Sequence, residues 1–334
     1  MNRLSTGCLD SLPKDVARPR YALDAVCVGV VHLGLGAFHR AHQAAYFDAR
    51  LAAGETDWAI CGASLRSPST QEALSPQDGL YTLSALGGRS EDLRVIGSLR
   101  ALFAAPSDIE PLLATACDPK VRMVSLTVTE KGYCHDPATC ELVESQQDIA
   151  HDRGQMRRAA LPASSSRRCA ADARQASRPS PSSAATICPT TAQPRARCSR
   201  EWRPCGRPTS VNGCADCVSC PSTMVDRIVP ATTDEDRQRI AIRLGRCDAW
   251  PVVTEPFTQW VVEDRFPSGR PRLEESGVTM VTDVAPFELA KLRLLNGSHS
   301  TLAYLGRLAG YETVSDAMAN PDFSGLVRSL MDKR

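Results

Sequence analysis

The sequence predicts an α/β fold built on a parallel β-sheet, and three observations support the prediction. Short apolar runs rich in β-branched residues, at 27–33 and 121–129, have the composition of buried strands. Segments of good helix formers occur at 39–53 and 108–117, so strands and helices alternate along the chain. This alternation is typical of a parallel sheet whose crossover connections are helices.

The bulk composition bounds the partners of this protein. The 334 residues suggest about two domains, and 43% hydrophobic residues are enough to build a core. The net charge of +1 gives no reason to expect nucleic acid or a membrane surface as a partner. The N-terminal segment lacks the apolar run of a secretory leader, and no segment approaches the roughly 18 apolar residues of a membrane span. We therefore expect a cytoplasmic protein whose partner is a small molecule.

The first strand runs into a glycine turn. Residues 27–38 read CVGVVHLGLGAF, so the run ends in Gly34-Leu35-Gly36 before a helix. Such a turn presents backbone N–H groups to a pyrophosphate, as in Rossmann-like domains that bind dinucleotides. His39 stands where the motif G-x-G-x-x-G has its third glycine. A tight strand–helix turn without a ligand is therefore the alternative.

Further elements are predicted on either side of the middle of the chain. A second strand at 57–65 ends in Leu65-Arg66-Ser67, with no clear acidic residue to bind the ribose of a dinucleotide. Residues 222–229 and 251–262 are strand-like, and 286–307 has a strong helical pattern.

Four motifs resemble the long-chain mannitol dehydrogenase and fructuronate reductase family. They are VHLGLGAFHRAHQA (31–44), SLTVTEKGYC (125–134), PSTMVDRIVP (221–230) and KLRLLNGSHS (291–300), with EPFTQWVVEDRF (255–266) as a fifth stretch in the same order. The resemblance covers 27–152 and 218–334. It implies a Rossmann-like NAD(P)-binding domain over 1–285, followed by the start of a mostly α-helical C-terminal domain at 286–334. Family members continue for well over a hundred residues, so the resemblance implies that the helical domain is truncated here.

The resemblance also implies a cofactor site and an activity. The cofactor is NAD, with NADP left open, and no metal is needed. Cofactor-binding positions are Gly34, Gly36, Ala37, Phe38, His39 and Arg40. The activity is that of an oxidoreductase that transfers a hydride between NAD(H) and C2 of a sugar polyol or ketose. Two substrate pairs stay open: mannitol with fructose, and mannonate with fructuronate.

Three residues of the 291–300 motif match the catalytic motif of the family. Oxidation of a secondary alcohol needs a base for the hydroxyl proton and a donor for the developing oxyanion. At about 100° per residue, Lys291, Asn296 and His299 project within an arc of roughly 140° on one α-helix. We expect a buried Lys291 of lowered pKa as the base, Asn296 as the oxyanion donor and His299 to orient the substrate oxygen. The alternative is a solvated lysine, an asparagine near a kink and a core histidine.

Further candidates are acidic. Asp226 matches an active-site aspartate of the family, and an ion pair with Arg227 is the alternative for it. Glu130 follows the end of a strand, where ligand sites gather in open α/β sheets. Glu288 lies one turn before Lys291. We interpret Glu130 and Glu288 as candidates for a proton relay.

The middle segment, 154–217, does not match the family. Residues 153–207 contain twelve arginines but only two acidic residues, and seven of the fourteen cysteines lie between 169 and 220. On composition this is a basic linker without a core pattern. When the codons of 183–189 are read in a displaced frame, the undetermined bases permit Ser-Cys-Asp-Asn-Leu-Pro, which is the string that the family has here.

We infer a frameshift near 153–160 that is reversed near 211–217. A natural Arg/Ser-rich insertion is the alternative. The frameshift predicts that 154–217 is irregular, that a strand is missing from the sheet, and that the product is unstable and inactive, a relic of an enzyme. An alternative from another class is a zinc-binding or nucleic-acid-binding module built on Cys205, Cys214, Cys217 and Cys220.

Overall fold

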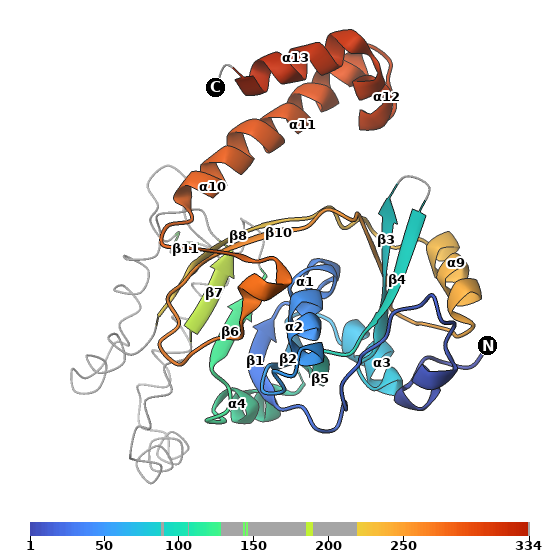
Figure 1. Cartoon of the computed structure of the whole chain (residues 1–334), viewed down its shortest axis with the longest axis vertical. Helices are drawn as coiled ribbons and strands as arrows, with labels where there is room; N and C mark the ends of the chain where they lie inside the picture. Colours follow the sequence, from blue (N-terminus) through green and yellow to red (C-terminus); the bar gives the residue numbers. More distant parts are fainter. Residues whose placement is uncertain are drawn as a thin grey trace. The chain divides into compact units, whose positions relative to one another are not determined.

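The computed structural model describes residues 1–87, 90–105, 107–127, 143, 145 and 219–332, together with the backbone of 185–189 (Figure 1). The chain forms two compact units, Met1–Met280 and Val281–Arg334. Within the described part, every helix is too short or too polar to cross a membrane.

The larger unit is built on an eight-stranded sheet with the order β11-β10-β8-β7-β6-β1-β2-β5 (Figure 1). The neighbouring strands from β5 to β8 are all parallel, whereas β10 is antiparallel to β8. The strands are β1 (Val28–Leu33), β2 (Ala59–Ser64), β5 (Leu99–Ala104), β6 (Met123–Leu126), β7 (Ala185–Pro189), β8 (Ser222–Asp226), β10 (Gln259–Glu263) and β11 (Thr279–Val281).

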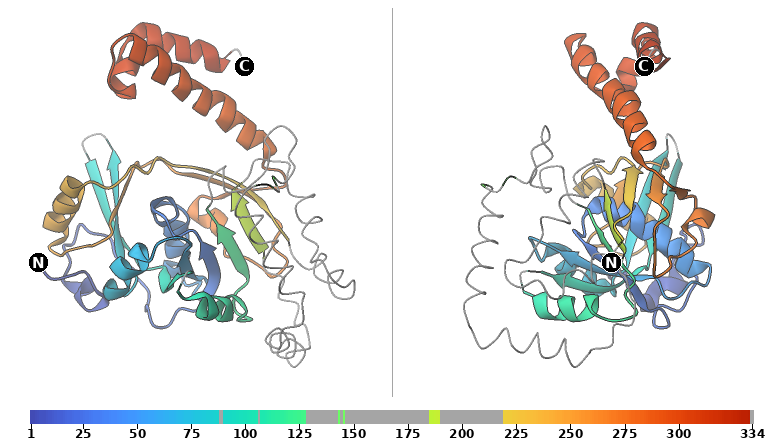
Figure 2. Two further views of the ribbon diagram at one scale, coloured as in Figure 1. Left: turned by 180° about the vertical axis from the view of Figure 1, so that it is seen from behind. Right: turned by 90° about the vertical axis from the view of Figure 1, so that its left-hand side faces the viewer.

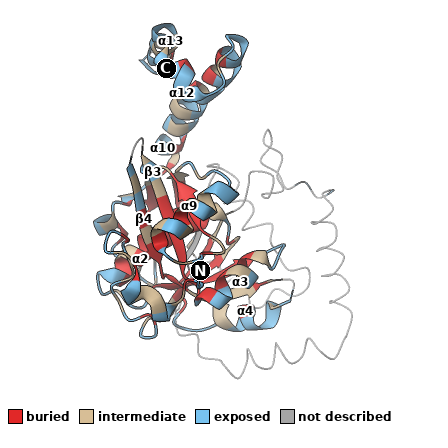
Figure 3. Cartoon of the chain, turned by 90° about the vertical axis from the view of Figure 1, so that its right-hand side faces the viewer, coloured by how far each residue is buried: buried red, intermediate tan, exposed pale blue. Residues whose placement is uncertain are grey.

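Helices cover both faces of this sheet. Successive side chains of a strand point to opposite faces, so apolar residues of one strand pack against helices on either side. Val30 belongs to a core that it shares with α2 (Gln43–Ala52), whereas its neighbour Val31 belongs to another core with Leu112 of α4 (Ile109–Ala116). Figure 3 shows that buried residues are concentrated in the strands of this unit. The parallel sheet between two helical layers confirms the predicted Rossmann-like fold.

A second sheet has the order β4-β3-β9 and was not predicted from the sequence. It comprises β3 (Tyr81–Gly87), β4 (Ser90–Ile96) and β9 (Val252–Thr254), and α9 (Asp234–Leu244) contributes Ile240 and Leu244 to its core. The shorter helical elements of this unit are η1 (Thr6–Ser11), α3 (Ser69–Leu74), η2 (Ser75–Gln77) and η4 (Leu273–Ser276).

Two predicted elements are each divided in the structure. The strand-like segment 251–262 is two strands in different sheets, β9 and β10, and Pro256 lies between them because it has no N–H for a ladder. The helix predicted at 39–53 is divided at His42, whose backbone angles are φ −117° and ψ −90°, into α1 (Ala37–Ala41) and α2.

The expectation that a strand is missing from the sheet is wrong. Within the segment that we predicted to be irregular, Ala185–Pro189 form β7, which pairs in parallel with β6 on one side and β8 on the other (Figure 2). A parallel strand contributes through its backbone N–H and C=O groups, so a segment of unsuitable composition can still complete the ladder. The remainder of 154–217 lies outside the described residues.

The smaller unit is helical, as predicted for the start of the C-terminal domain. One long helix runs through α10 (Ala285–Ala290), a π-helical segment η5 (Lys291–Asn296), α11 (Gly297–Thr301) and a second π-helical segment η6 (Leu302–Gly306). It is followed by α12 (Val314–Ala319) and α13 (Pro321–Asp332). Leu302, Ala317 and Val327 form its small core.

Candidate functional site

The strand order of the large sheet reverses between β1 and β6. From β1 the chain proceeds through β2 to β5 on one side, and it returns through β6, β7 and β8 on the other. In open parallel sheets, ligands bind outside the carboxyl ends of the strands at such a switch point. The turn Gly34–Gly36 follows β1, and Thr127 follows β6, so both lie at this edge.

The first glycine of the turn is required by the backbone. Gly34 has φ +95°, a region that side chains with a Cβ rarely adopt. A Cβ added there would lie 2.6 Å from the carbonyl oxygen of Thr127. The Gly34 N–H donates to the carbonyl oxygen of Ala63 at 2.9 Å, which fixes the turn against β2. The turn is therefore held tightly between β2 and β6.

The second glycine leaves space beside the backbone. A Cβ added at Gly36 would meet only the carbonyl oxygen of Gly34, at 3.8 Å, and Gly36 itself is exposed. The N–H groups of Ala37 and Phe38 begin α1 and have no acceptor within the helix. Open space beside free N–H groups is what a dinucleotide pyrophosphate needs, so these residues fit the predicted cofactor.

A buried histidine network braces the turn, and sequence reasoning missed it. The Thr127 hydroxyl donates to the Gly34 carbonyl oxygen at 2.8 Å, so its oxygen accepts from Nε2 of His32 at 3.0 Å. His32 Nδ1 then accepts from the Ser125 hydroxyl at 2.7 Å. Burial lowers the pKa of His32 to about 3, so the ring is neutral, as this network requires. The signal available in the sequence was a histidine within an otherwise apolar strand.

His39 stacks on this histidine. The ring centroids of His32 and His39 are 3.4 Å apart and nearly parallel. His39 is completely buried, and neither ring nitrogen has a hydrogen-bond partner among the described residues. The pKa of His39 lies well below its ordinary value. Burial is the main cause because it disfavours the charged ring, and the nearby His32 lowers the pKa further. His39 therefore packs beside His32, next to the Gly34–Gly36 turn, as a neutral ring.

The residues on either side of His39 in the chain, Phe38 and Arg40, differ in exposure. Arg40 is buried, donates to the Trp250 carbonyl oxygen at 2.5 Å, and lies over the ring of Tyr81 at 5.3 Å. These contacts connect α1 with β3 and with the segment before β9. Phe38 is half-buried and stacks on His42 at 5.2 Å between ring centroids. Of the predicted cofactor-binding residues, His39 and Arg40 are buried, whereas Gly36 is exposed and Gly34, Ala37 and Phe38 are half-buried.

The acidic candidates have different outcomes. Asp226 is the last residue of β8 and is half-buried. In the antiparallel ladder its backbone lies opposite that of Gln259 of β10. The guanidinium of Arg227 donates to the backbone carbonyl oxygens of Ala41 and Glu255. Glu130 lies outside the described residues. The zinc alternative lies there as well, except for Cys220, which is exposed.

The catalytic candidates of the smaller unit lie on its long helix. Lys291 and Asn296 are the two ends of the π-helical segment η5, and His299 follows in α11. The arc of 140° assumed an α-helix, so it does not hold here, because a π-helix has a wider turn with i→i+5 hydrogen bonds. Lys291 is half-buried rather than buried, Asn296 and His299 are exposed, and Glu288 is buried.

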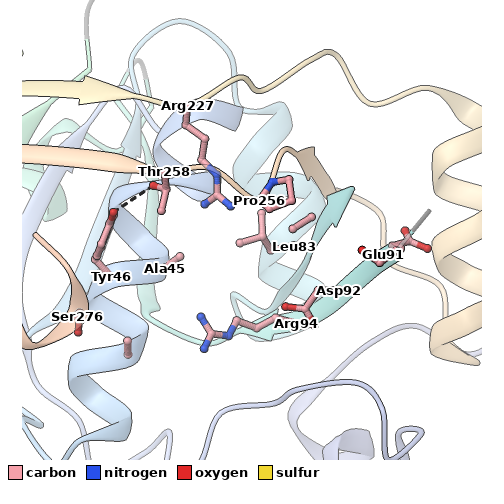
Figure 4. Close-up of a pocket in the computed structure, with 13 residues that line it drawn as sticks. Ala45, Tyr46, Leu83, Glu91, Asp92, Arg94, Arg227, Pro256, Thr258 and Ser276 are labelled. Carbon is pink, nitrogen blue, oxygen red and sulfur yellow. Dashed lines mark hydrogen bonds between the residues drawn. The ribbon is translucent and has the colours of Figure 1, made fainter. Parts of the chain in front are cut away.

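A cavity of about 450 Å³ lies elsewhere in the larger unit (Figure 4). It is lined by α2, β3, β4 and the segment before β10, and the guanidinium groups of Arg94 and Arg227 point into it. The Tyr46 and Thr258 hydroxyls meet at its edge at 3.1 Å. None of the predicted site residues lines it. We therefore place the candidate dinucleotide site at the Gly34–Gly36 turn, where strand order and open N–H groups coincide.

Family models match both units. The model of the mannitol dehydrogenase Rossmann domain matches residues 28–185 and 210–275. The model of the mannitol dehydrogenase C-terminal domain matches residues 283–334.

Individual relatives agree with these matches. Mannitol 2-dehydrogenase of Aspergillus niger is 39% identical and aligns with 91% of this chain and 62% of its own length. D-mannonate oxidoreductase of Escherichia coli is 40% identical and aligns with 95% of this chain and 66% of its own length. The solved structure of Pseudomonas fluorescens mannitol 2-dehydrogenase, a ternary complex with NAD and D-mannitol, is 35% identical with a TM-score of 0.78; the match covers 99% of this chain and 68% of that one. The chain spans about three fifths of the length of the curated mannitol 2-dehydrogenases.

Proposed function

Because the chain belongs to the mannitol dehydrogenase family, we propose that it carries the cofactor domain and the first catalytic helix of an oxidoreductase that transfers a hydride between NAD(H) and C2 of a sugar polyol or ketose. The observation that carries the proposal is the turn Gly34–Gly36, which is braced at the switch point of the sheet with open space beside Gly36. The solved relative with NAD supports the choice of cofactor.

In this proposal the residues of the smaller unit handle the proton and the oxygen. NAD(H), when bound, exchanges the hydride with C2. Lys291 accepts the proton of the C2 hydroxyl, and Asn296 donates an amide N–H to the oxygen as negative charge develops. His299 orients the same oxygen. Glu288, buried one turn before Lys291, is proposed to relay the proton, with Glu130 as a second relay, and Asp226 is assigned to the substrate site.

Mannitol with fructose is the proposed substrate pair, supported by the names of several relatives. Mannonate with fructuronate is the second candidate, and the relative named D-mannonate oxidoreductase favours it. The discriminating feature is a basic group against the C1 carboxylate of the uronate. The small-molecule partner is part of this proposal, and the cytoplasmic location expected from the sequence stays a prediction.

The test compares Lys291→Met with its parent, both made in a chain whose codons for 153–217 are returned to the displaced frame, because the chain as given is expected to be inactive. If Lys291 is the base, kcat for mannitol or mannonate oxidation falls by about 10² to 10⁴, while the dissociation constant of NADH stays within twofold. Lys120→Met, at an exposed lysine of the larger unit, is the matched control and retains activity. Full activity of Lys291→Met would contradict the assignment, and the ratio of kcat/KM for the two substrates decides between the pairs.

A further inference from the structure

The end of β2 is the second part of the candidate dinucleotide site. β2 lies beside β1 in the sheet, and its carboxyl end lies at the same edge as the Gly34–Gly36 turn. When a pyrophosphate binds at such a turn, the adenosine ribose lies over the end of the neighbouring strand. A carboxylate there binds the ribose 2′-hydroxyl of NAD, whereas an arginine accommodates the 2′-phosphate of NADP.

This edge carries a cation and hydroxyls. Arg66 follows β2 by two residues, is exposed, and makes no hydrogen bond or ion pair within the described part of the chain. The Ser67 hydroxyl donates to the Ser69 oxygen at 3.0 Å, and the Ser69 N–H donates to the Ser67 oxygen at 3.2 Å. The Ser64 hydroxyl, at the last position of β2, is buried and has no hydrogen-bond partner in the part of the chain that the structure describes. Donors for a phosphate are therefore concentrated in a few residues.

Neither of the carboxylates near this edge, Asp108 and Glu72, lies at the end of β2, where a ribose-binding acid would be expected. Asp108 accepts from the Ala104 N–H at 2.9 Å and from the Gln71 amide at 2.8 Å, so one of its oxygens is bound to the β5–α4 connection. These hydrogen bonds hold its pKa below the ordinary value. Glu72 lies within α3, six positions beyond Arg66, and is exposed. The segment 64–71 itself contains no acidic residue.

We propose that Arg66, with Ser67 and Ser69, binds the 2′-phosphate of NADP(H), so that this chain binds NADP(H) in addition to NAD(H) and more tightly. The inference rests on the proposed function, because it needs a dinucleotide at the Gly34–Gly36 turn. A guanidinium makes two charge-assisted hydrogen bonds to a phosphate, and no carboxylate at the end of β2 repels that phosphate.

The experiment measures binding rather than turnover. The full chain is titrated with NADPH and with NADH at low ionic strength, following nucleotide fluorescence, and with 2′,5′-ADP and 5′-AMP by calorimetry. We expect NADPH to bind at least about tenfold more tightly than NADH, and 2′,5′-ADP more tightly than 5′-AMP. Arg66→Ala removes the preference while the NADH dissociation constant stays within twofold, and Arg66→Asp reverses the preference.

Arg20→Ala is the matched control, because Arg20 is also exposed and has no bonded partner in the described residues. It leaves the preference unchanged. Equal or tighter binding of NADH by the unchanged chain overturns the inference and leaves the proposed function standing. If neither dinucleotide binds to the folded chain, both the inference and the proposed function are overturned. A preference for NADPH that survives Arg66→Ala also overturns the assignment to Arg66.

Discussion

The conformation of the Gly34–Gly36 turn depends on a few residues in direct contact with it. Gly34 fits because a side chain would collide with the Thr127 carbonyl, and Thr127 is placed by His32. The histidine is neutral because burial opposes its charge, and only the neutral ring can both accept from Ser125 and donate to Thr127. A proton added to His32 would break this arrangement.

Substitutions of the two glycines of the turn are predicted to affect different properties, namely folding stability for Gly34 and NADH binding for Gly36. Gly34→Ala strains a positive φ and pushes a Cβ to 2.6 Å from a backbone oxygen, so we expect the free energy of unfolding to fall by about 2 kcal/mol or more. Gly36→Ala, with an ordinary φ of −95° and open space, is expected to keep the melting temperature and to weaken NADH binding. Thermal melts and NADH titrations of both variants measure this. Equal melting temperatures for the two variants would count against the geometry.

His32 makes folding stability depend on acid. Its pKa is about 3 in the folded chain, against an ordinary value of 6.5, so the unfolded chain takes up the proton first. The stability that His32 contributes is complete above pH 6.5 and is lost as the pH falls from 6.5 towards 3, at about 1.4 kcal/mol per pH unit. His32→Gln keeps hydrogen-bonding atoms without this titration.

Urea unfolding of both proteins between pH 7 and pH 4 is the measurement. We expect the unfolding free energy of His32→Gln to fall less steeply with acid than that of the unchanged chain. The buried His39 adds a slope of the same sign to both proteins, so the difference belongs to position 32. Parallel curves for the two proteins would show that His32 does not titrate in this window.

At the scale of elements, the long helix of the smaller unit is shaped by its π-helical segments. A π-helical turn holds one residue more than an α-helical turn, and such turns are frequent at functional sites. Here Lys291 and Asn296 bound the first of these segments. Their relative orientation is therefore set by the extra residue and not by α-helical spacing.

Deletion of Leu292 tests this orientation. Leu292 is 44% exposed, so its loss costs little core packing. We expect the segment to become α-helical, which rotates Asn296 and His299 by about 100° relative to Lys291. In the chain whose codons for 153–217 are returned to the displaced frame, the deletion should lower activity by about 100-fold or more and leave the helix content measured by circular dichroism unchanged. Leu292→Ala is the control and keeps its activity; a deletion variant as active as this control would contradict the role of the π-turn.

At the scale of the whole molecule, the segment 154–217 contributes one strand to the large sheet. Its backbone supplies β7 between β6 and β8, so the ladder is continuous across the larger unit. A ladder needs only backbone groups, whereas the core and the substrate pocket need particular side chains. The frameshift therefore remains our hypothesis for the side chains of this segment.

A chain whose codons for 153–217 are returned to the displaced frame provides the test. We expect it to unfold at a higher temperature than the chain as given, and to oxidise mannitol or mannonate when the latter does not. The reason is that the displaced frame permits Ser-Cys-Asp-Asn-Leu-Pro in the restored strand and loop, the string inferred for the family at this position. Calorimetry and NADH formation are the two measurements. Equal stability and activity of the two chains would favour a natural insertion.

The sequence by itself determined the strand β1 with its glycine turn, the parallel sheet and the helical start of the smaller unit. These follow from apolar runs and turn residues that are local in the chain. Only the tertiary structure decided that His32 meets Ser125 and Thr127, 93 and 95 positions away, and that 251–262 serves two sheets. Such pairings depend on which strands become neighbours, and local composition does not encode strand order. The burial of Arg40 beside Tyr81 and Trp250 was also visible only in the structure. Tyr81 begins β3 and Trp250 precedes β9, so both partners are distant from Arg40 in the sequence.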